Sequence, residues 1–287
     1  MCAKQYVRND IYSAVKKGDS MSYEQILYEP GTVARVILNR PRYRNAQSRV
    51  LLEEMDNAFT RAVADDAVRV IVLSGAGDHF SSGHDLGTPE ELADREKRGY
   101  PRDPHARHIR LQEVYCDMHL RWRNLPKPTI AMVQGYCIFG GWMIASAMDL
   151  IFAAEDAMFL ASLFQYFTVP WDLGTRKAKE ILFESRFMTA QEALGHGLVN
   201  RVFPREKLEE ETLAYAHRVA ENRPFGLRLI KFAVNQMQDT MGFSTAVRAA
   251  LQTYSLRSLD EQAPQSGAPR RRPGVEQALK NLEESRG

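Results

Sequence analysis

The alternation of strand-like and helix-like segments in the first half of the chain constrains the fold more than any other feature. Residues 32–39, TVARVILN, are rich in β-branched side chains and predict a strand. Ser48 stands where a helix N-cap belongs, and apolar residues from Leu51 to Ala62 recur at helical spacing. Residues 68–77, VRVIVLSGAG, then predict a buried strand that ends in glycines. The order strand, helix, strand favours a layered α/β core.

The same order repeats further along the chain. A helical pattern from Leu111 to Trp122 stops at a pair of prolines, and residues 129–135, TIAMVQG, predict the next strand. A helix opened by two adjacent glycines follows. Residues 149–154, DLIFAA, then predict a strand, and a long irregular stretch occupies residues 159–174.

The character of the sequence changes after Thr189. Thr189 and Glu192 form a capping box, and helical patterns then continue almost to Leu256. A Pro-, Gly- and Arg-rich stretch separates them from a last short helical pattern, VEQALKNLEE. We therefore predict an N-terminal extension (residues 1–21), an α/β core (22–190), a helical C-terminal region (191–258), and a flexible linker with a short tail helix (259–287).

Composition excludes several classes of protein. The chain is 44% hydrophobic with a net charge of +2, and no apolar run reaches the ~20 residues that span a bilayer, so we expect no membrane partner. The small charge and the lack of a base-reading motif argue against nucleic acid. Cys2, Cys116 and Cys137 lack metal-binding spacing and are typical of reduced thiols, which predicts a cytoplasmic protein without a metal site.

Two loops carry glycines where backbone can approach a ligand. They are residues 79–87, HFSSGHDLG, and residues 136–143, YCIFGGWM, and each follows a predicted strand. If the loops lie side by side, one backbone N–H from each can hold a single oxygen anion. The glycine pair also opens a helix, where unpaired N–H groups and the helix dipole favour negative charge.

These loops, together with LNRPRYRNA (residues 38–46) and MTAQEALGHGLVNRVFP (residues 188–204), resemble the crotonase superfamily, the enoyl-CoA hydratase/isomerase family. The resemblance extends from about residue 22 to residue 256. It implies a core spiral of repeated ββα units and a helical C-terminal region that builds a homotrimer or a hexamer of two trimers. It also implies an acyl-CoA thioester as substrate, with coenzyme A entering as part of that substrate and no permanently bound cofactor.

The resemblance also assigns roles to particular residues. The N–H groups of His84 and Gly140 are expected to hold the thioester oxygen and stabilise an enolate-like anion. Removing one such donor typically raises the barrier by ~3 kcal/mol. Arg42, Arg44 and Ala46 are expected to bind the coenzyme A part of the substrate.

One departure from the family pattern concerns the acid/base groups. Hydratases of this family carry two glutamates that activate water, and Met143 and Leu163 occupy those positions here. Together with Trp142, Phe164 and Trp171, these side chains predict an apolar pocket suited to a bulky or ring-containing acyl group.

Asp172 is the leading candidate for the missing acid/base. It lies in VPWDLGT, which resembles a segment where dienoyl-CoA isomerases and some dehalogenases of the superfamily carry a working aspartate. Burial near aromatic residues would raise its pKa and suit proton transfer. The alternative is that Asp172 caps a helix beginning near Gly174. His84 and His108 are further candidates, and for each the alternative is a structural or surface histidine.

The sequence therefore predicts an acyl-CoA thioester-processing enzyme of the enoyl-CoA hydratase/isomerase type. The reaction is left open between isomerisation, hydrolysis of a C–C or thioester bond, and an atypical hydration. The competing hypothesis is a non-catalytic acyl-CoA-binding protein that has lost the hydratase glutamates.

Overall fold

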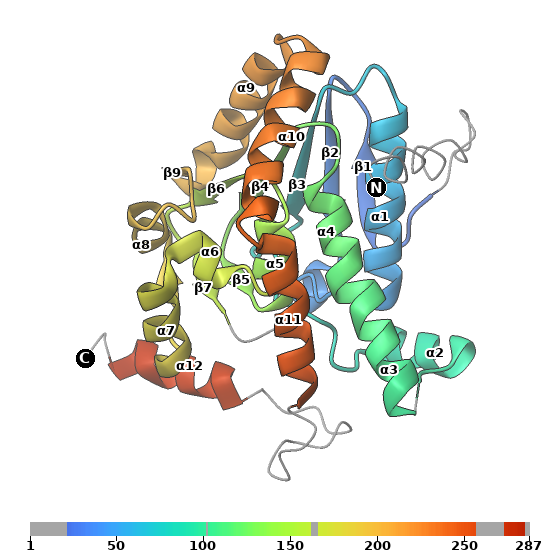
Figure 1. The fold of residues 1–287 in the computed structure, drawn as a ribbon, viewed down its shortest axis with the longest axis vertical. Helices are drawn as coiled ribbons and strands as arrows, with labels where there is room; N and C mark the ends of the chain where they lie inside the picture. Colours follow the sequence, from blue (N-terminus) through green and yellow to red (C-terminus); the bar gives the residue numbers. More distant parts are fainter. Residues whose placement is uncertain (1–21, 102, 162–165, 257–272, 285–287) are drawn as a thin grey trace.

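The structure is a computed structural model that describes residues 22–101, 103–161, 166–256 and 273–284. The predicted N-terminal extension, and the linker through residue 272, lie outside these described residues. Figure 1 shows sheets enclosed by helices, with the last helix running beneath the body of the molecule.

The larger sheet forms the centre of the core and is mostly parallel. β1 pairs with β2 in antiparallel orientation, and every other neighbouring pair is parallel. The strand order is β1-β2-β3-β4-β6-β9. The strands are β1 (Ile26–Glu29), β2 (Val33–Leu38), β3 (Val70–Gly75), β4 (Thr129–Val133), β6 (Leu150–Ala154) and β9 (Arg201–Phe203).

A smaller sheet carries the second glycine loop. Its strands are β5 (Tyr136–Ile138), β7 (Met158–Leu160) and β8 (Met188–Thr189), in the order β5-β7-β8. The chain passes from β4 in the large sheet to β5 in the small one within two residues, Gln134 and Gly135. The two sheets and their helices confirm the predicted α/β fold class.

Helices bury opposite faces of the larger sheet. Leu51, Phe59 and Ala62 of α1 (Arg49–Ala64) pack on one face together with α4 (Met118–Arg123) and α5 (Gly140–Ser146). On the other face, α9 (Leu208–Ala220) packs against the alternate side chains of the same strands. Because successive strand side chains point to opposite faces, a sheet covered on both sides needs apolar residues throughout, as in β3 and β4.

Capping residues begin two of the predicted helices. Ser48 is the N-cap of α1, and its Oγ accepts a hydrogen bond from Leu51 N at 3.1 Å. Thr189 caps α8 (Ala190–Gly195), and its Oγ1 accepts from Glu192 N at 3.2 Å. Both caps satisfy backbone N–H groups that the first helical turn leaves without a partner.

The helical pattern predicted from Leu111 to Trp122 has an internal irregularity. α3 (Pro104–Leu111) leads into a π-helical turn, Gln112–Asp117, before α4 continues. A π-turn inserts one residue and rotates everything that follows it on the helix surface. The remaining elements before the second glycine loop are a 3-10 turn, Pro41–Tyr43, and α2 (Pro89–Arg98).

The stretch predicted as irregular, residues 159–174, contains a short helix, so that prediction is wrong for its second half. α6 (Val169–Leu173) and α7 (Thr175–Glu184) follow one another through Gly174, whose φ of 76° suits glycine. Pro170 in the first turn of α6 fits a helix start, where its missing N–H costs nothing.

The C-terminal region is helical, as predicted, with one exception. β9 interrupts the helices and pairs with β6, so this stretch belongs to the larger sheet. A 3-10 turn, Arg205–Lys207, then leads into α9, α10 (Pro224–Thr240) and α11 (Phe243–Ser255). The predicted tail helix is present as α12 (Pro273–Glu284). None of the helices in the described ranges is long and apolar enough to cross a membrane.

Candidate functional site

The two glycine loops lie side by side, which is the arrangement on which the oxyanion hypothesis depends. Ser81 N donates a hydrogen bond to Tyr136 O, and Ile138 N donates to Ser81 O, both at 2.9 Å. This parallel pairing extends the edge of the small sheet into the first loop. It brings Gly83 against the start of α5.

Both glycines are required by the close approach of the loops. A Cβ on Gly83 would lie 2.7 Å from Ile138 O and 3.1 Å from Gly140 N, and Gly83 has a φ of 89°. A Cβ on Gly140 would lie 2.6 Å from Gln47 Oε1 and 2.8 Å from His84 Cε1. A side chain at Gly83 would press on the backbone of the second loop, and one at Gly140 would displace the side chains of Gln47 and His84.

The entry into α5 is strained. Phe139, its N-cap, has φ 53° and ψ −109°, a backbone conformation that residues other than glycine rarely adopt. The Phe139 N–H donates to Leu160 O at 2.8 Å, which anchors this turn to β7. As the first residue of α5, Gly140 has no intrahelical acceptor for its own N–H, which points out of the helix start.

His84 places its imidazole beside the same helix start. The ring packs on Tyr115 of the π-turn, with centroids 4.1 Å apart, and reaches the space in front of Gly140. Gln47 N donates to Gly83 O at 2.8 Å and Asp85 N donates to Gln47 O at 2.9 Å, which fixes the backbone on both sides of His84. The structure thus brings His84 and Gly140 together.

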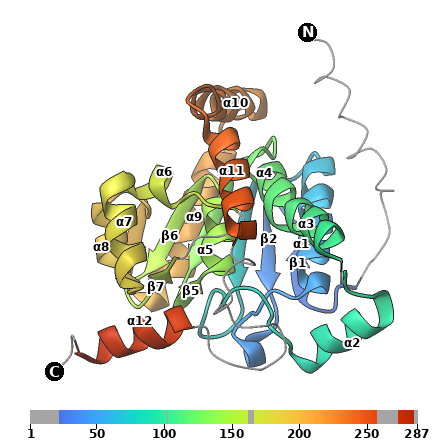
Figure 2. The same ribbon diagram turned by 60° about the horizontal axis from the view of Figure 1, so that its bottom comes forward.

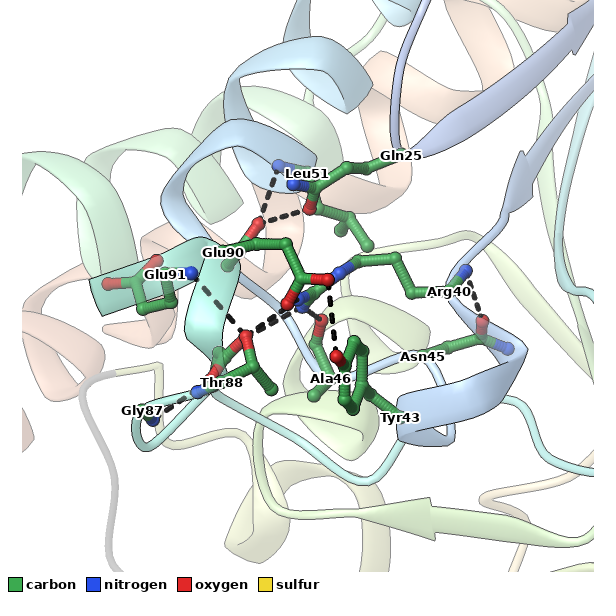
Figure 3. Close-up of polar contacts among 12 residues, drawn as sticks. Gln25, Arg40, Tyr43, Asn45, Ala46, Leu51, Gly87, Thr88, Glu90 and Glu91 are labelled. Carbon is green, nitrogen blue, oxygen red and sulfur yellow. Dashed lines mark hydrogen bonds and ion pairs between the residues drawn. The ribbon is translucent and has the colours of Figure 1, made fainter. Parts of the chain in front are cut away.

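A buried ion pair between Arg40 and Asp85 holds the first loop in place, and Figure 3 shows Arg40 with its neighbours Asn45, Ala46 and Thr88. Arg40 donates to Asp85 Oδ2 at 2.7 Å and to Thr88 Oγ1 at 2.8 Å, and its guanidinium is almost fully buried. Asp85 Oδ1 accepts from the backbone N–H groups of Gly87 and Thr88. Burial alone would raise the pKa of Asp85, but the hydrogen bonds from Thr88, Gly87 and Arg40 outweigh it and lower that pKa. Asp85 is therefore a structural carboxylate.

The residues expected to bind coenzyme A lie on the turn between β2 and α1. Arg42 and Arg44 are exposed there, and Arg44 O accepts a hydrogen bond from Ser82 N at 2.9 Å, which ties this turn to the first loop. Ala46 is buried, and its carbonyl accepts from Arg40 Nη1 at 2.6 Å. The two arginines are thus available to a ligand, whereas the Ala46 carbonyl already has a strong donor.

Asp172 lies on α6 and faces α5. Its Oδ2 accepts hydrogen bonds from Thr168 Oγ1 at 2.7 Å and from Ser146 Oγ at 2.9 Å. Burial raises the pKa of Asp172 to about 6, and the hydroxyls of Thr168 and Ser146 and the indole of Trp142 partly oppose this effect. The Trp142 Nε1 makes no hydrogen bond of regular geometry within the described part of the chain. A carboxyl with a pKa near neutrality can both accept and donate a proton.

The alternative interpretation of Asp172, a helix cap, does not agree with the structure. α7 begins after Gly174 and has no side-chain cap. Asp172 is instead an internal residue of α6, and its N–H donates to Thr168 O at 3.0 Å. Its side chain is free of a capping role and turns toward α5.

The predicted pocket residues fall into three groups. Trp142 and Met143 on α5 are almost completely buried, and Trp142 packs edge-on against Phe159. Trp171 is partly buried and packs against Phe243 of α11. The remaining two predicted pocket residues, Leu163 and Phe164, lie outside the described residues.

His108 is held at some distance along its helix. Its Nδ1 lies 3.1 Å from Ser255 Oγ on α11. His108 precedes Tyr115, the residue that touches His84, by seven positions, which is about 10 Å of helix. The described contacts of His108 are those of a residue that joins α3 to α11, and its catalytic role stays a prediction.

Several polar residues near the site could not be identified as site residues from the sequence. Ser146 and Thr168, the hydrogen-bond partners of Asp172, stand four positions from Trp142 and from Asp172 itself, a spacing that places each pair on one helix face. His119 and Tyr166 are fully buried with ring centroids 5.2 Å apart. Burial lowers the pKa of His119 to about 3, so this imidazole is neutral at physiological pH.

Metal-ligating clusters are not found in the part of the chain that the structure describes. No group of three or more His, Cys, Asp or Glu side chains converges there. Cys116 and Cys137 are free and buried, and burial raises the pKa of both thiols. Neither thiol is suited to act as a thiolate at neutral pH.

Comparison with known proteins gives consistent results. The model of the enoyl-CoA hydratase/isomerase family matches residues 29–267. EchA13 of Mycobacterium tuberculosis (strain ATCC 25618 / H37Rv), which is named after enoyl-CoA hydratase, is 38% identical over 257 residues, covering 82% of this chain and 80% of that protein.

Solved structures agree with this match. A crystal structure from Mycobacterium thermoresistibile, titled for enoyl-CoA hydratase, superimposes with a TM-score of 0.74 at 43% identity, covering 80% of this chain and 95% of the other. An enoyl-CoA hydratase/isomerase from Xanthobacter autotrophicus Py2 gives a TM-score of 0.74 at 32% identity, covering 92% and 94%. The adjoining glycine loops, the sheets and these similarities together show that the chain belongs to the enoyl-CoA hydratase/isomerase family, the crotonase superfamily.

Proposed function

We propose that the protein is an acyl-CoA thioester-processing enzyme that stabilises a thioester enolate. In this proposal the backbone N–H groups of His84 and Gly140 hold the thioester oxygen, and Asp172 moves the proton. The reaction is an isomerisation, a C–C or thioester hydrolysis, or an atypical hydration of a bulky acyl-CoA. The observation that carries the proposal is α5, which begins at Gly140 and contacts the Asp172 carboxyl through its last residue, Ser146.

The chemistry follows from charge placement. Removing a proton from the acyl group leaves negative charge on the thioester oxygen, and N–H donors at a helix start stabilise that charge. Asp172 has a pKa of about 6, so it is mostly ionised at pH 7 and can accept the proton. The raised pKa also makes it a stronger base than an ordinary carboxylate. Met143 is buried and has no ionisable group, so it leaves proton transfer to Asp172.

The experiment is isotope exchange in heavy water. Saturated, enoyl, dienoyl and β-keto acyl-CoA thioesters are incubated with the protein and followed by mass spectrometry, with Asp172→Asn in parallel. We expect deuterium uptake or a mass change that Asp172→Asn abolishes. Asp156→Asn, which removes a surface carboxylate paired with Arg205, is the matched control and is expected to retain activity.

A non-catalytic acyl-CoA-binding protein is the second candidate function. Met143, at the position of a hydratase glutamate, favours it, because a thioether cannot transfer protons. In the same experiment, tight binding of the thioesters without exchange or conversion in any of them would favour this candidate over the enzyme.

We also propose that the chain assembles into a homotrimer or a hexamer of two trimers through α10. Figure 2 shows α10 standing apart from the sheets. Apolar side chains along it are exposed, with Phe225 71% and Phe232 65% accessible, and such a surface is costly to leave in water. Sedimentation of the parent protein and of the Phe232→Glu variant tests this. We expect the parent to be an oligomer and the variant, with a carboxylate in the interface, to dissociate. A monomeric parent would contradict the proposal.

Binding of the coenzyme A phosphates is assigned to Arg42 and Arg44. Both are exposed on the turn that adjoins the first loop. We expect Arg44→Gln to weaken binding of free coenzyme A and to reduce its dependence on salt, because a phosphate contact is electrostatic. Isothermal titration at two ionic strengths measures this, and unchanged affinity at both would remove Arg44 from the site.

A further inference from the structure

We propose that Ser146 and Thr168 are positioning residues that fix one oxygen of Asp172, Oδ2, and leave Oδ1 as the oxygen that exchanges a proton with the acyl group. This inference rests on the proposed function and specifies how its acid/base works. Neither Ser146 nor Thr168 is expected to touch the substrate.

The two hydroxyls converge on the same atom from two different helices. Ser146 is the last residue of α5, and Thr168 precedes the first turn of α6. Both donate to Oδ2, at 2.9 and 2.7 Å. Thr168 does so in preference to capping α6, since its side chain makes no cap hydrogen bond. Two donors from separate elements fix both the position of Oδ2 and the plane of the carboxyl group.

The other oxygen is in a different situation. The hydroxyls of Ser146 and Thr168 both donate to Oδ2 and neither donates to Oδ1, while the Trp142 indole makes no hydrogen bond of regular geometry within the described residues. Asp172 also keeps a partly exposed surface. Oδ1, to which neither hydroxyl donates, is therefore the oxygen that the proposal assigns to proton exchange with the acyl group.

The groups around Asp172 leave the hydroxyls as the main control of its charge. On α5 the neighbours are Ser146 and the indole of Trp142, and on α6 the neighbour is Thr168. Tyr166 is the titratable group that interacts with Asp172 across space, and burial raises the pKa of Tyr166 so far that it stays neutral. Arg123 acts on Tyr166, and no described cation hydrogen-bonds to Asp172.

The proton step is balanced without a further reactant. Oδ1 accepts a proton from an acyl carbon that is next to the thioester carbonyl or conjugated with it through a C=C bond, and the electron pair of that C–H bond shifts to the carbonyl, which becomes an enolate oxygen held by the backbone donors. Asp172, now protonated on Oδ1, returns the proton to a carbon of the same acyl group. Ser146 and Thr168 keep their hydroxyl protons and donate hydrogen bonds to Oδ2 throughout.

The test compares pH profiles in Ser146→Ala and Thr168→Val. Each change removes a donor that favours the charged carboxylate, so the pKa of Asp172 should rise by about one unit. Carbon-13 NMR titration of labelled aspartate in the full chain measures this directly, without substrate. The rate of deuterium exchange into the reactive thioester of the panel should show the same upward shift of its acidic limb and fall about fivefold at pH 6.

Conservative and matched variants separate positioning from stability. Ser146→Thr and Thr168→Ser keep the hydroxyls and should keep the parent profile, and they remain informative if Thr168→Val folds poorly. Ser244→Ala removes another serine-to-aspartate hydrogen bond, 2.7 Å to Asp239, and should leave the titration of Asp172 unchanged.

The outcomes distinguish this inference from the proposed function. If Asp172→Asn keeps full exchange, or no thioester exchanges with the parent protein, the proposed function fails. If Asp172→Asn is inactive but Ser146→Ala and Thr168→Val titrate like the parent, the proposed function stands and the positioning role is wrong. A loss of activity that is equal at every pH would also overturn the positioning role.

Discussion

Asp85 and Asp172 are two carboxylates in interior positions, and their surroundings give them opposite properties. Asp85 meets a guanidinium, two backbone N–H groups and a hydroxyl, which together lower its pKa. Asp172 meets two hydroxyls and no cation by hydrogen bond in the described structure, and burial raises its pKa to about 6. Burial raises the pKa of both carboxyls, and only at Asp85 do the hydrogen bonds outweigh it, so Asp85 is held ionised and Asp172 can exchange a proton.

The largest effect is expected from Asp172→Asn on turnover. Loss of a general acid/base typically lowers the rate 10²- to 10⁴-fold, so deuterium exchange should fall by roughly that factor. Asp85→Asn should instead act through stability and loop position. Exchange rates measured at a temperature where both variants are folded make this comparison. Equal losses of rate in the two variants would contradict the assignment of a catalytic role to Asp172 and a structural role to Asp85.

The next largest effect is expected from Arg40→Met on stability. This change leaves Asp85 charged and buried without its cation, and breaking such a pair costs about 3–5 kcal/mol. The pKa of Asp85 is lowered in the folded state, so its contribution is present above the ordinary carboxyl pKa and is lost as pH falls through the folded value. Urea unfolding at pH 7 and at pH 3 should therefore show a larger loss at pH 7.

A smaller effect of opposite sign is expected at Asp172. Its pKa of about 6 lies above the ordinary value of 3.8, so the folded protein binds a proton more tightly than the unfolded chain and loses stability as pH rises from about 4 to 6. Asp172→Asn should remove this penalty and stabilise the protein above pH 6 by up to about 3 kcal/mol. Unfolding curves that coincide at pH 8 would contradict this sign.

The smallest effect is expected from Thr88→Val. The Thr88 hydroxyl donates to Asp85 Oδ2 at 2.6 Å, as the hydroxyls of Ser146 and Thr168 do to Asp172. Because Asp85 keeps its guanidinium, we expect a loss of about 1 kcal/mol in unfolding free energy and no change in the pH profile of exchange. A shifted profile would mean that the two carboxylates are coupled.

Much of the fold could be predicted from the sequence because its signals are local. Ser48 and Thr189 indicate helix starts because their hydroxyls can cap the first turn. The apolar runs of β3 and β4 are long enough to identify buried strands. β9 was missed because it is three residues long and gains its pairing only from β6, far away in the sequence. The short helix α6 was missed for a similar reason.

The candidate site was predictable where glycines mark it. The two loops could be identified because their glycines are visible in the sequence, and the family resemblance then pointed to His84 and Gly140. The hydroxyl partners of Asp172 could not be named, since Ser146 and Asp172 meet only after α5 and α6 pack together. A serine at a helix end has many possible uses, and its sequence alone does not choose among them.

The length of α5 has a consequence for the size of the acyl group. Gly140 and Ser146 are its first and last residues, so about 9 Å of helix rise separates the proposed oxyanion donor from the residue that holds Asp172. Internal hydrogen bonds of the helix fix that span. An acetyl thioester gripped at Gly140 would end well short of Asp172, whereas a long or ring-bearing acyl group would lie alongside the helix and reach it. Under the proposed assignment, α5 would set a minimum chain length for a thioester whose proton Asp172 removes.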